Sequence, residues 1–450
     1  MKRNVLFFII FLFAQTLQSE QHFIFPEGFL KGVALSAYQN GGDLYGKSNW
    51  THFVNKQNGK KTFISDYQPC GTATNFWGNA HNDIALIKEL GCNSVRFSIE
   101  WAVIEPEPGC FNETMLSWYE DYCTALINAG IMPTITLHHF VHPHWFDEIG
   151  GFTKESNIQY FTRFSKTVFN RLHTKVRFWY TINEPTVYSF MGYILGMHSP
   201  GHHMNFKDAA QVLKNLLLAH VHVYHTLKKL PGGNESQIGI VHQVLKAQAY
   251  SDWSPIGRMI AWFLNKISAH EIIKKFLQTG HFEYRIGGLV HIDHHCPNAP
   301  HSYDFIGINY YSRVIASSTG PTCYPGEIMT DMEYAIHAPG IYDAIRDLSE
   351  LKVPIYITEN GIPDAQDCHR AHFIKEYLAE VHRAIADGFD VRGYFYWTLM
   401  DNYEWDRGFT QKFGLYEVDF DSLERTLRPG AIPFKDLFSV ANFIKNQTNN

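Results

Sequence analysis

The feature that most constrains the fold of this chain is an alternation, repeated eight times, of short apolar runs with longer segments of helical periodicity. The runs that predict strands are residues 29–39, 94–99, 132–139, 176–183, 238–244, 305–310, 355–359 and 393–399. The segments that predict helices are residues 80–90, 113–129, 154–172, 206–230, 255–279, 341–351, 370–387 and 434–446. This order is typical of an α/β protein with a parallel sheet.

No long Pro/Ser linker and no low-complexity tract separates these eight units. We therefore expect residues 20–450 to form a single (β/α)8 TIM barrel domain, with the active site at the C-terminal ends of the strands. A doubly wound open sheet is the alternative fold. No Gly-x-Gly-x-x-Gly turn follows any of the runs, so a dinucleotide cofactor is not expected. The formal charge of -6, without a basic patch, favours neither nucleic acid nor an anionic membrane as a partner.

The N-terminus has the pattern of a cleavable signal peptide over residues 1–19. Lys2 and Arg3 precede the apolar run 5–13, and small or polar residues follow around Ser19. No later stretch approaches the roughly 18 apolar residues of a membrane-spanning helix. We therefore expect a product that is secreted or enters a lysosome-like lumen, with no transmembrane segment. Candidate N-glycan acceptors are Asn49, Asn112, Asn234 and Asn446.

Seven cysteines follow the leader, too few for a small fold held by disulfides. The odd number leaves at least one thiol unpaired. Cys110 could pair with Cys70 or with Cys123 in an oxidising compartment, and the sequence leaves both pairings open.

Polar side chains gather where the predicted strands end. Apart from two glutamates, they are Gln39, His138, His139, Asn183, Asn309, Tyr310, Tyr311, Asn360 and Trp397. The glutamates are Glu184 and Glu359, on the fourth and seventh strands. If the barrel closes, these two carboxylates face one another across its mouth, as catalysis at a glycosidic bond requires.

A single Glu at a strand end is more often a helix cap or a surface ion-pair partner. Two on opposing strands are harder to explain structurally, because each follows an apolar β-rich run, where burying an ionisable group is costly. Glu184 precedes Pro185, and Glu359 precedes the turn Asn360-Gly361. The pair therefore favours a catalytic interpretation.

Six motifs in order carry a resemblance to a known family. They are residues 29–39 (FLKGVALSAYQ), 95–98 (VRFS), 181–185 (TINEP), 304–311 (DFIGINYY), 357–361 (ITENG) and 397–405 (WTLMDNYEW). From residue 25 to about residue 437, the chain resembles glycoside hydrolase family 1, the β-glucosidase-like barrels related to lactase and Klotho. The resemblance implies a retaining β-glycosidase, most of all a β-glucosidase, acting on O-glycosides of neutral sugars without a cofactor.

The resemblance also implies a role for each matching residue. Glu184 corresponds to the acid/base and Glu359 to the nucleophile of a double displacement, which retaining enzymes hold roughly 5–5.5 Å apart. Arg96 and Tyr311 correspond to the groups that support the nucleophile. The residues that correspond to substrate-binding positions are Gln39, His139, Asn183, Asn309, Trp397, Glu404 and Trp405.

Two histidine-rich stretches, residues 138–144 and 291–296, raise the question of a metal site. Neither has zincin spacing, and Pro143 interrupts the first. We expect no metal, and we expect the second stretch to be a solvated loop before the sixth strand.

The chain departs from the family pattern at residues 39–42 (QNGG), at Phe140 beside His139, and at Tyr334 on the aglycone side. These departures concern the aglycone and the fit of the sugar. A Klotho-like binding protein typically lacks one of the two glutamates, and a thioglucosidase has Gln at the acid/base position; both glutamates are present here. The negative charge of Glu404 is expected to repel a 6-phosphosugar. A co-receptor with little hydrolase activity and a transglycosidase remain the alternatives.

Overall fold

The computed structural model describes residues 23–57 and 68–436. Its centre is a closed barrel of eight parallel strands in the order β1-β13-β12-β9-β5-β4-β3-β2. The barrel strands are β1 (Leu30–Ala34), β2 (Ser94–Ser98), β3 (Met132–His138), β4 (Phe178–Asn183), β5 (Gln237–Gln243), β9 (Phe305–Asn309), β12 (Ile355–Asn360) and β13 (Val391–Trp397). All eight runs expected from the sequence contribute a strand, so the predicted TIM barrel is confirmed and the open sheet is wrong.

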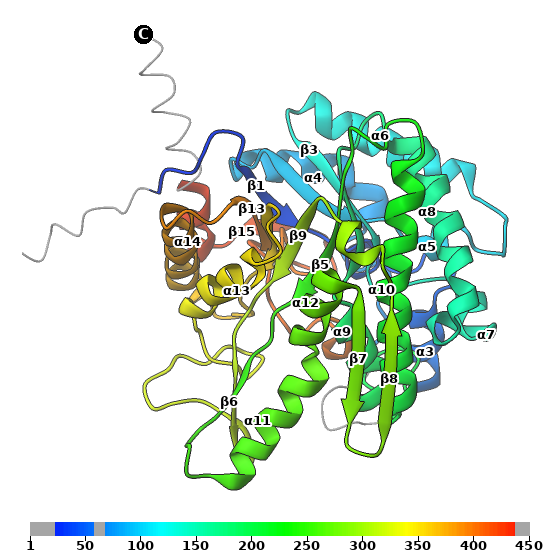
Figure 1. Ribbon diagram of the computed structural model, residues 1–450. Helices are drawn as coiled ribbons and strands as arrows, with labels where there is room; N and C mark the ends of the chain where they lie inside the picture. Colours follow the sequence, from blue (N-terminus) through cyan, green and yellow to red (C-terminus); the bar gives the residue numbers. More distant parts are fainter. Residues whose placement is uncertain (1–22, 58–67, 437–450) are drawn as a thin grey trace, which may run out of the picture.

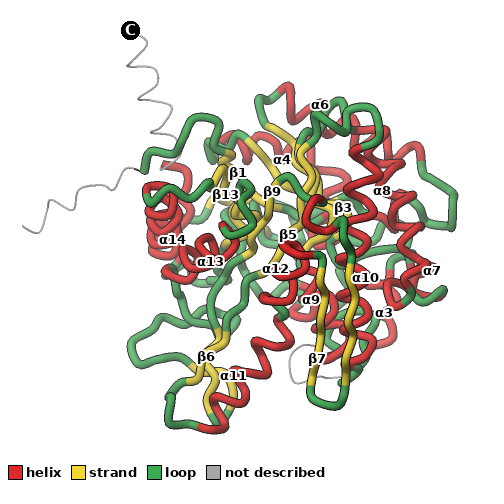
Figure 2. Tube along the Cα trace, viewed as in Figure 1, coloured by secondary structure: helices red, strands yellow, loops and turns green. Residues whose placement is uncertain are grey.

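Helices surround this barrel, as Figure 2 shows with strands at the centre and helices outside. Those that follow barrel strands are α4 (Phe76–Glu89), α6 (Glu113–Asn128), α8 (Ile158–Leu172), α10 (Phe206–Lys228), α11 (Pro255–Ser268), α12 (His270–Thr279), α13 (Pro339–Ser349) and α14 (Arg370–Ala386). Helix α8 shows why these segments are helical: Phe161, Phe164, Val168 and Leu172, three or four residues apart, are all buried.

Shorter elements lie in the loops after the strands. The helices among them are α2 (Ala37–Gly41), α3 (Asn49–Gln57), α5 (Trp101–Ile104), α7 (His144–Glu148) and α9 (Pro185–Phe190). The small sheets contain β6 (Ala247–Ala249), β10 (Val314–Ser317) and β11 (Gly320–Thr322), then β7 (His281–Ile286) with β8 (Val290–His295), and β14 (Tyr416–Val418) with β15 (Arg425–Leu427).

Residues along β4 alternate between two apolar clusters. On β4, Phe178 and Tyr180 pack in the barrel interior with Phe305 and Trp397, whereas Trp179 joins the larger cluster between strands and helices. Space for these rings comes partly from glycine: a Cβ on Gly239 would lie 2.6 Å from the ring of Phe305. The barrel is therefore a packed core, and only its mouth is open to a ligand.

Three sequence predictions of local structure were wrong. The first strand ends at Ala34, and Gln39 lies in α2 rather than at a strand end. The helix expected over residues 255–279 is divided into α11 and α12 at Ala269, which has a left-handed φ of 51°. Residues 291–295 belong to β8, paired antiparallel with β7, rather than to a loop.

Other predictions concern residues at the edge of the described ranges. The signal peptide over residues 1–19 lies outside them, and so do Asn446 and most of the helix expected over residues 434–446. None of the described helices is long and apolar enough to cross a bilayer. All seven cysteines are described, and each is a free thiol, so neither open pairing of Cys110 is formed.

The three described sequons differ in accessibility. Asn49 is buried, and its amide Nδ2 donates to the carbonyl of Phe140 at 3.2 Å, so the native fold has no room for a glycan there. Asn112 caps α6, accepting from the Met115 N–H at 3.2 Å. Asn234 is exposed in the turn before β5.

Candidate active site

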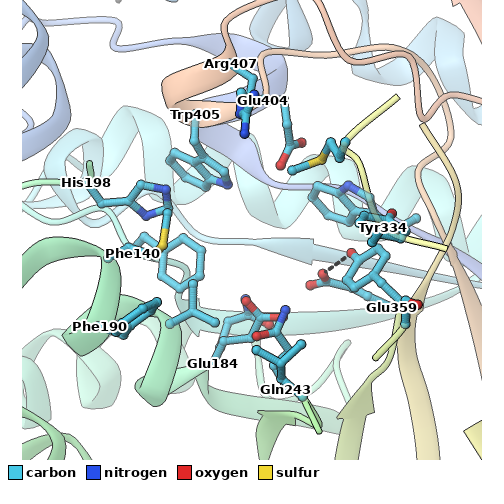
Figure 3. Close-up of a pocket in the computed structure, with 18 of the residues that line it drawn as sticks. Phe140, Glu184, Phe190, His198, Gln243, Tyr334, Glu359, Glu404, Trp405 and Arg407 are labelled. Atoms are coloured by element: carbon cyan, nitrogen blue, oxygen red, sulfur yellow. Dashed lines mark hydrogen bonds between the residues drawn. The ribbon is translucent and has the colours of Figure 1, made fainter. Parts of the chain in front are cut away.

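Glu184 and Glu359 are both buried at the C-terminal end of the barrel. Glu184 directly follows β4, with a left-handed φ of 45°, and Glu359 is the penultimate residue of β12. In the ring of strands these two positions define a short arc, formed by β5 and β9, and a long arc, formed by β13, β1, β2 and β3. Figure 3 shows the two carboxylates in one pocket, approaching it from different strands.

Each carboxylate oxygen of Glu359 accepts a hydrogen bond from a different side chain. Arg96 Nη1 donates to Oε1 at 2.7 Å, and the Tyr311 hydroxyl donates to Oε2 at 2.8 Å. The Arg96 guanidinium is buried and held elsewhere too, by Asn183 Oδ1 at 2.6 Å and Thr136 Oγ1 at 3.0 Å. A buried cation and a charge-assisted hydrogen bond both favour the ionised carboxylate, and they fix its orientation.

Glu184 has no cationic partner in contact with it among the described residues. Its Oε1 accepts from Asn309 Nδ2 at 2.8 Å. Burial raises the pKa of Glu184 to about 8, and the negative charge of Glu359 contributes further to the increase. At neutral pH the Glu184 carboxyl is therefore mainly protonated, whereas its neighbour is paired with a cation.

Groups from the long arc form one end of the pocket. Gln39 Nε2 donates to Glu404 Oε2 at 3.2 Å, and the His139 ring stacks with Trp397 and Trp405 at centroid distances of 5.9 and 6.0 Å. Burial, with a contribution from Arg96, holds the pKa of His139 well below its ordinary value, so the ring is neutral. This end therefore offers flat rings and neutral polar groups, the surface that a sugar ring requires.

Glu404 belongs to the same end of the pocket, and burial raises its pKa to about 8. Nearby negative charges of Asp406 and Glu359 add to the increase. The carboxyl is therefore largely protonated at neutral pH, which weakens the expected electrostatic repulsion of a 6-phosphosugar. Glu404 can instead act as a hydrogen-bond donor as well as an acceptor.

The predicted site residues come together around a cavity of about 310 Å³. Those that line it are His139, Asn183, Glu184, Tyr311, Glu359, Trp397, Glu404 and Trp405. Arg96 lies behind this wall, and Gln39 is joined to it through Glu404. Asn309, expected to bind substrate, also lies behind the wall: it bonds to Glu184, to Asn183 Oδ1 at 3.2 Å and to Thr358 Oγ1 at 2.7 Å.

The family model described as glycosyl hydrolase family 1 matches residues 21–443. This chain belongs to glycosyl hydrolase family 1. It is 31% identical to Beta-glucosidase A of Acetivibrio thermocellus over 93% of this chain and 99% of that protein. It is also 28% identical to a 6-phospho-beta-galactosidase of Clostridium acetobutylicum, over 91% of this chain and 96% of that protein.

Solved structures agree with this assignment. The beta-glycosidase from Pyrococcus horikoshii has a TM-score of 0.81 at 34% identity, covering 93% of this chain and 95% of that chain. A beta-glucosidase from Thermotoga maritima in complex with deoxynojirimycin has a TM-score of 0.81 at 26% identity, covering 94% and 99%. The family 1 protein is therefore an O-glycosyl hydrolase with the family's barrel.

The cavity has a second end, formed by the segments after the short arc and by α9. Most of the residues at this end were not predicted from the sequence. Its apolar lining residues are Val187, Phe190, Met191, Val244, Leu245, Val314 and Met332. They occur in segments without a recognisable motif, so only the fold brings them together. Tyr334, noted on the aglycone side from the sequence, does line the cavity.

A buried contact between a histidine and an aspartate at the long-arc end was also missed. His198 Nε2 lies 3.3 Å from Asp406 Oδ1, and both residues line the cavity beside Trp405. Phe140, the other noted departure, packs edge-on against Trp405 with centroids 5.3 Å apart. Within residues 23–57 and 68–436, no three His, Cys, Asp or Glu side chains are grouped as a metal site requires.

Proposed function

We propose that this family 1 hydrolase cleaves O-glycosidic bonds of neutral β-D-glycosides, above all β-glucosides, with net retention. Glu359 is the nucleophile and Glu184 the acid/base. The observation that carries this proposal is the difference in surroundings: Arg96 and Tyr311 both donate to Glu359, whereas Glu184 is buried beside an amide and has a pKa of about 8. A retaining mechanism needs one ionised and one protonated carboxyl.

In the first step, a carboxylate oxygen of Glu359 attacks the anomeric carbon as the bond to the leaving oxygen breaks. The proton on Glu184 passes to that oxygen, so the aglycone departs as a neutral alcohol or phenol. Asn309 donates to Glu184 and to Asn183, and Asn183 in turn accepts from Arg96, so these side chains keep the two carboxyls in place.

In the second step, water replaces the aglycone. Ester formation has removed the negative charge of Glu359, and that charge raised the pKa of Glu184 in the free enzyme. The pKa of Glu184 therefore falls, and its carboxylate accepts a proton from water as water attacks the anomeric carbon. The Glu359 ester bond breaks, which restores the enzyme.

The preference for a neutral sugar rests on the long-arc end of the pocket. Gln39, His139 and the largely protonated Glu404 are uncharged hydrogen-bonding groups near neutral pH, and Trp397 and Trp405 provide rings for the sugar faces. The cation nearest to the reacting carboxyls, Arg96, is paired with Glu359. A 6-phospho-β-glucoside is the comparison substrate, because one relative bears that activity in its name.

The test is hydrolysis of aryl β-glucosides by wild type, Glu359→Gln and the control Glu148→Gln, whose side chain is 66% exposed. We expect at least about a thousandfold loss of kcat for Glu359→Gln and no change for the control. A slowly hydrolysed 2-fluoro glucoside is expected to label Glu359. With an unfluorinated aryl β-glucoside, β-glucose is expected to be the first product detected by NMR. Unchanged activity of Glu359→Gln would falsify the assignment.

The same assay separates the alternatives. A Klotho-like co-receptor turns over no aryl glycoside, and a transglycosidase gives glycosylated alcohol in place of glucose when an acceptor alcohol is added. Wild type that gives neither product contradicts the proposed hydrolase.

We also propose that the protein enters the secretory route and carries a glycan at Asn234, the exposed sequon. Expression in a eukaryotic secretory host should give medium-borne protein that begins near residue 20. Glycosidase treatment is expected to lower its mass, and Asn234→Gln to remove part of that decrease. Protein retained in the cell with its leader intact contradicts this localisation.

A further inference from the structure

Helix α11 exposes a row of large apolar side chains. Ile256, Met259 and Trp262 are 51%, 60% and 53% exposed, and Trp253, just before the helix, is 93% exposed. The three helical residues are spaced three apart and lie on one side of the helix. We refer to these four residues as the outer face of α11. A group of exposed apolar side chains marks an interaction surface, whereas single exposed apolar residues scattered over a surface do not.

The opposite side of α11 is already packed. Ala261 is buried with Ala247 of β6 and Ala316 of β10. The helix approaches β10 so closely that a Cβ on Gly257 would lie 2.9 Å from the Ala316 carbonyl oxygen. Helix α11 is therefore packed on its inner side, and the fold of this chain gives the outer face no partner among the described residues.

Helix α11 itself carries charges of one sign. Arg258 and Lys266 are exposed, and the helix contains no Asp or Glu; Asp252, an acidic residue next to the outer face, is exposed beside Trp253. Tryptophan, aliphatic and methionine side chains on one face, with basic residues beside them, are typical of helices that lie in the interface of a bilayer. A second copy of the chain is a poorer partner, because a two-fold contact here brings Arg258 and Lys266 near their symmetry mates.

Helix α11 packs next to the apolar end of the active-site cavity through the side opposite its outer face. Val314 lines the cavity and packs in the same cluster as Ala261 of α11. Helix α9, whose Val187 and Phe190 line the cavity, also contacts α11. In Figure 1, α11 and β6 lie together at the lower edge of the molecule, beyond the barrel strands.

We propose that the outer face of α11 binds the surface of a phospholipid bilayer and holds the cavity next to amphiphilic β-glycosides in that surface. Binding follows from the exposed side chains alone, and the choice of amphiphilic glycosides rests on the proposed function. The apolar short-arc end then receives the alkyl part of the aglycone, and the long-arc end receives the sugar. The sequence alone does not reveal this surface, because the fold decides which side of α11 is exposed.

The test is flotation of the full-length protein with vesicles of phosphatidylcholine alone or of equimolar phosphatidylcholine and phosphatidylserine. Wild type is expected to float with both, and more strongly with the anionic mixture. The variant Trp253→Ser/Trp262→Ser should lower the vesicle-bound fraction at least about tenfold. Leu289→Ser is the matched control, because Leu289 is 70% exposed in the turn between β7 and β8 and is not one of the four residues of the outer face.

Intrinsic fluorescence provides a second measurement. Vesicles should shift tryptophan emission to the blue in wild type and in Leu289→Ser, but not in the double variant. Three results would overturn the proposal. They are a wild type that binds neither vesicle, equal binding by wild type and the double variant, and a dimer in sedimentation that depends on the outer face.

An activity assay separates this inference from the proposed function. A soluble aryl β-glucoside should be hydrolysed equally by wild type and the double variant. An alkyl β-glucoside embedded in vesicles should be hydrolysed at least about tenfold more slowly by the variant. If neither substrate is hydrolysed but vesicles bind, the proposed function fails and the membrane surface stands.

Discussion

Glu184 and Glu359 are both buried at the barrel mouth, but a positively charged hydrogen-bond donor contacts only Glu359. Arg96 and Tyr311 occupy its two oxygens, whereas Glu184 accepts a bond from the neutral amide of Asn309. The sequence identified both carboxyls and the supporting side chains, because all of them lie within motifs. It did not reveal that Asn309 lies behind the cavity wall, which depends on how β9 packs between β5 and β12.

Replacing Tyr311 with Phe tests the support of Glu359, the proposed nucleophile. Tyr311→Phe removes the donor to Glu359 Oε2 and retains Arg96, so we expect kcat/KM to fall about tenfold to a hundredfold, the range for a hydrogen bond to a charged group. Tyr310→Phe is the control, because its hydroxyl donates to the His337 carbonyl at 3.1 Å, away from both carboxyls. Equal effects of the two changes would contradict a direct role for Tyr311.

The raised pKa of Glu184 predicts a loss of activity in mild alkali. The acid must be protonated, so kcat/KM for a poorly activated phenyl β-glucoside should fall as pH rises through about 8. The pKa of Glu404 is also about 8, and leaving-group dependence separates the two residues. With a dinitrophenyl glucoside, which needs little protonation, the decline should weaken. A decline equally steep for both substrates argues against Glu184.

At the scale of elements, all eight barrel strands could be predicted because each lies in a short run rich in apolar residues and bounded by turns. The break at Ala269 could not, because alanine favours helix and nothing local requires its left-handed φ. The β7–β8 hairpin was missed although Gly287-Gly288, flanked by strand-like residues, is a recognised turn pattern. The end of β1 was misjudged because residues 35–39 continue the apolar run while the backbone turns into α2.

The contact between the ends of β12 and β13 predicts a sensitive position. A Cβ on Gly361 would lie 1.8 Å from the Trp397 carbonyl oxygen, so Gly361→Ala must move the strand end that carries Trp397. We expect a loss of about 1–3 kcal/mol in the free energy of unfolding by urea, together with weaker substrate binding. Gly288→Ala has no atom within 4 Å and serves as the control. Equal stability of the two variants would show that the strand ends tolerate separation.

At the scale of the whole molecule, the buried acidic groups of the site reduce stability as pH increases. The folded-state pKa values of Glu184 and Glu404 are about 8, above the ordinary 4.5. Between about pH 4.5 and pH 8, each carboxyl is protonated in the folded state and ionised in the unfolded state. Each therefore contributes a stabilisation that is fully present below about pH 4.5 and is lost as the pH rises through about 8.

The double variant Glu184→Gln/Glu404→Gln should therefore lose less stability than wild type when pH is raised from about 5 to about 8. Thermal unfolding of both proteins across that range measures the difference. Glu148→Gln should follow wild type, since its side chain is largely exposed. Parallel curves for wild type and the double variant would mean that the two carboxyls titrate normally.

The division of the strand ring into a short and a long arc has a consequence for how specificity can diverge. In the proposed function, the residues that face the sugar follow β13, β1 and β3, whereas the apolar residues on the side of the leaving group follow β5 and β9 or lie in and just after α9. Insertions or exchanges in these latter segments change the released group without moving Glu404 or Trp397. Descendants of one ancestral barrel can therefore inherit the same sugar grip and acquire new leaving groups segment by segment.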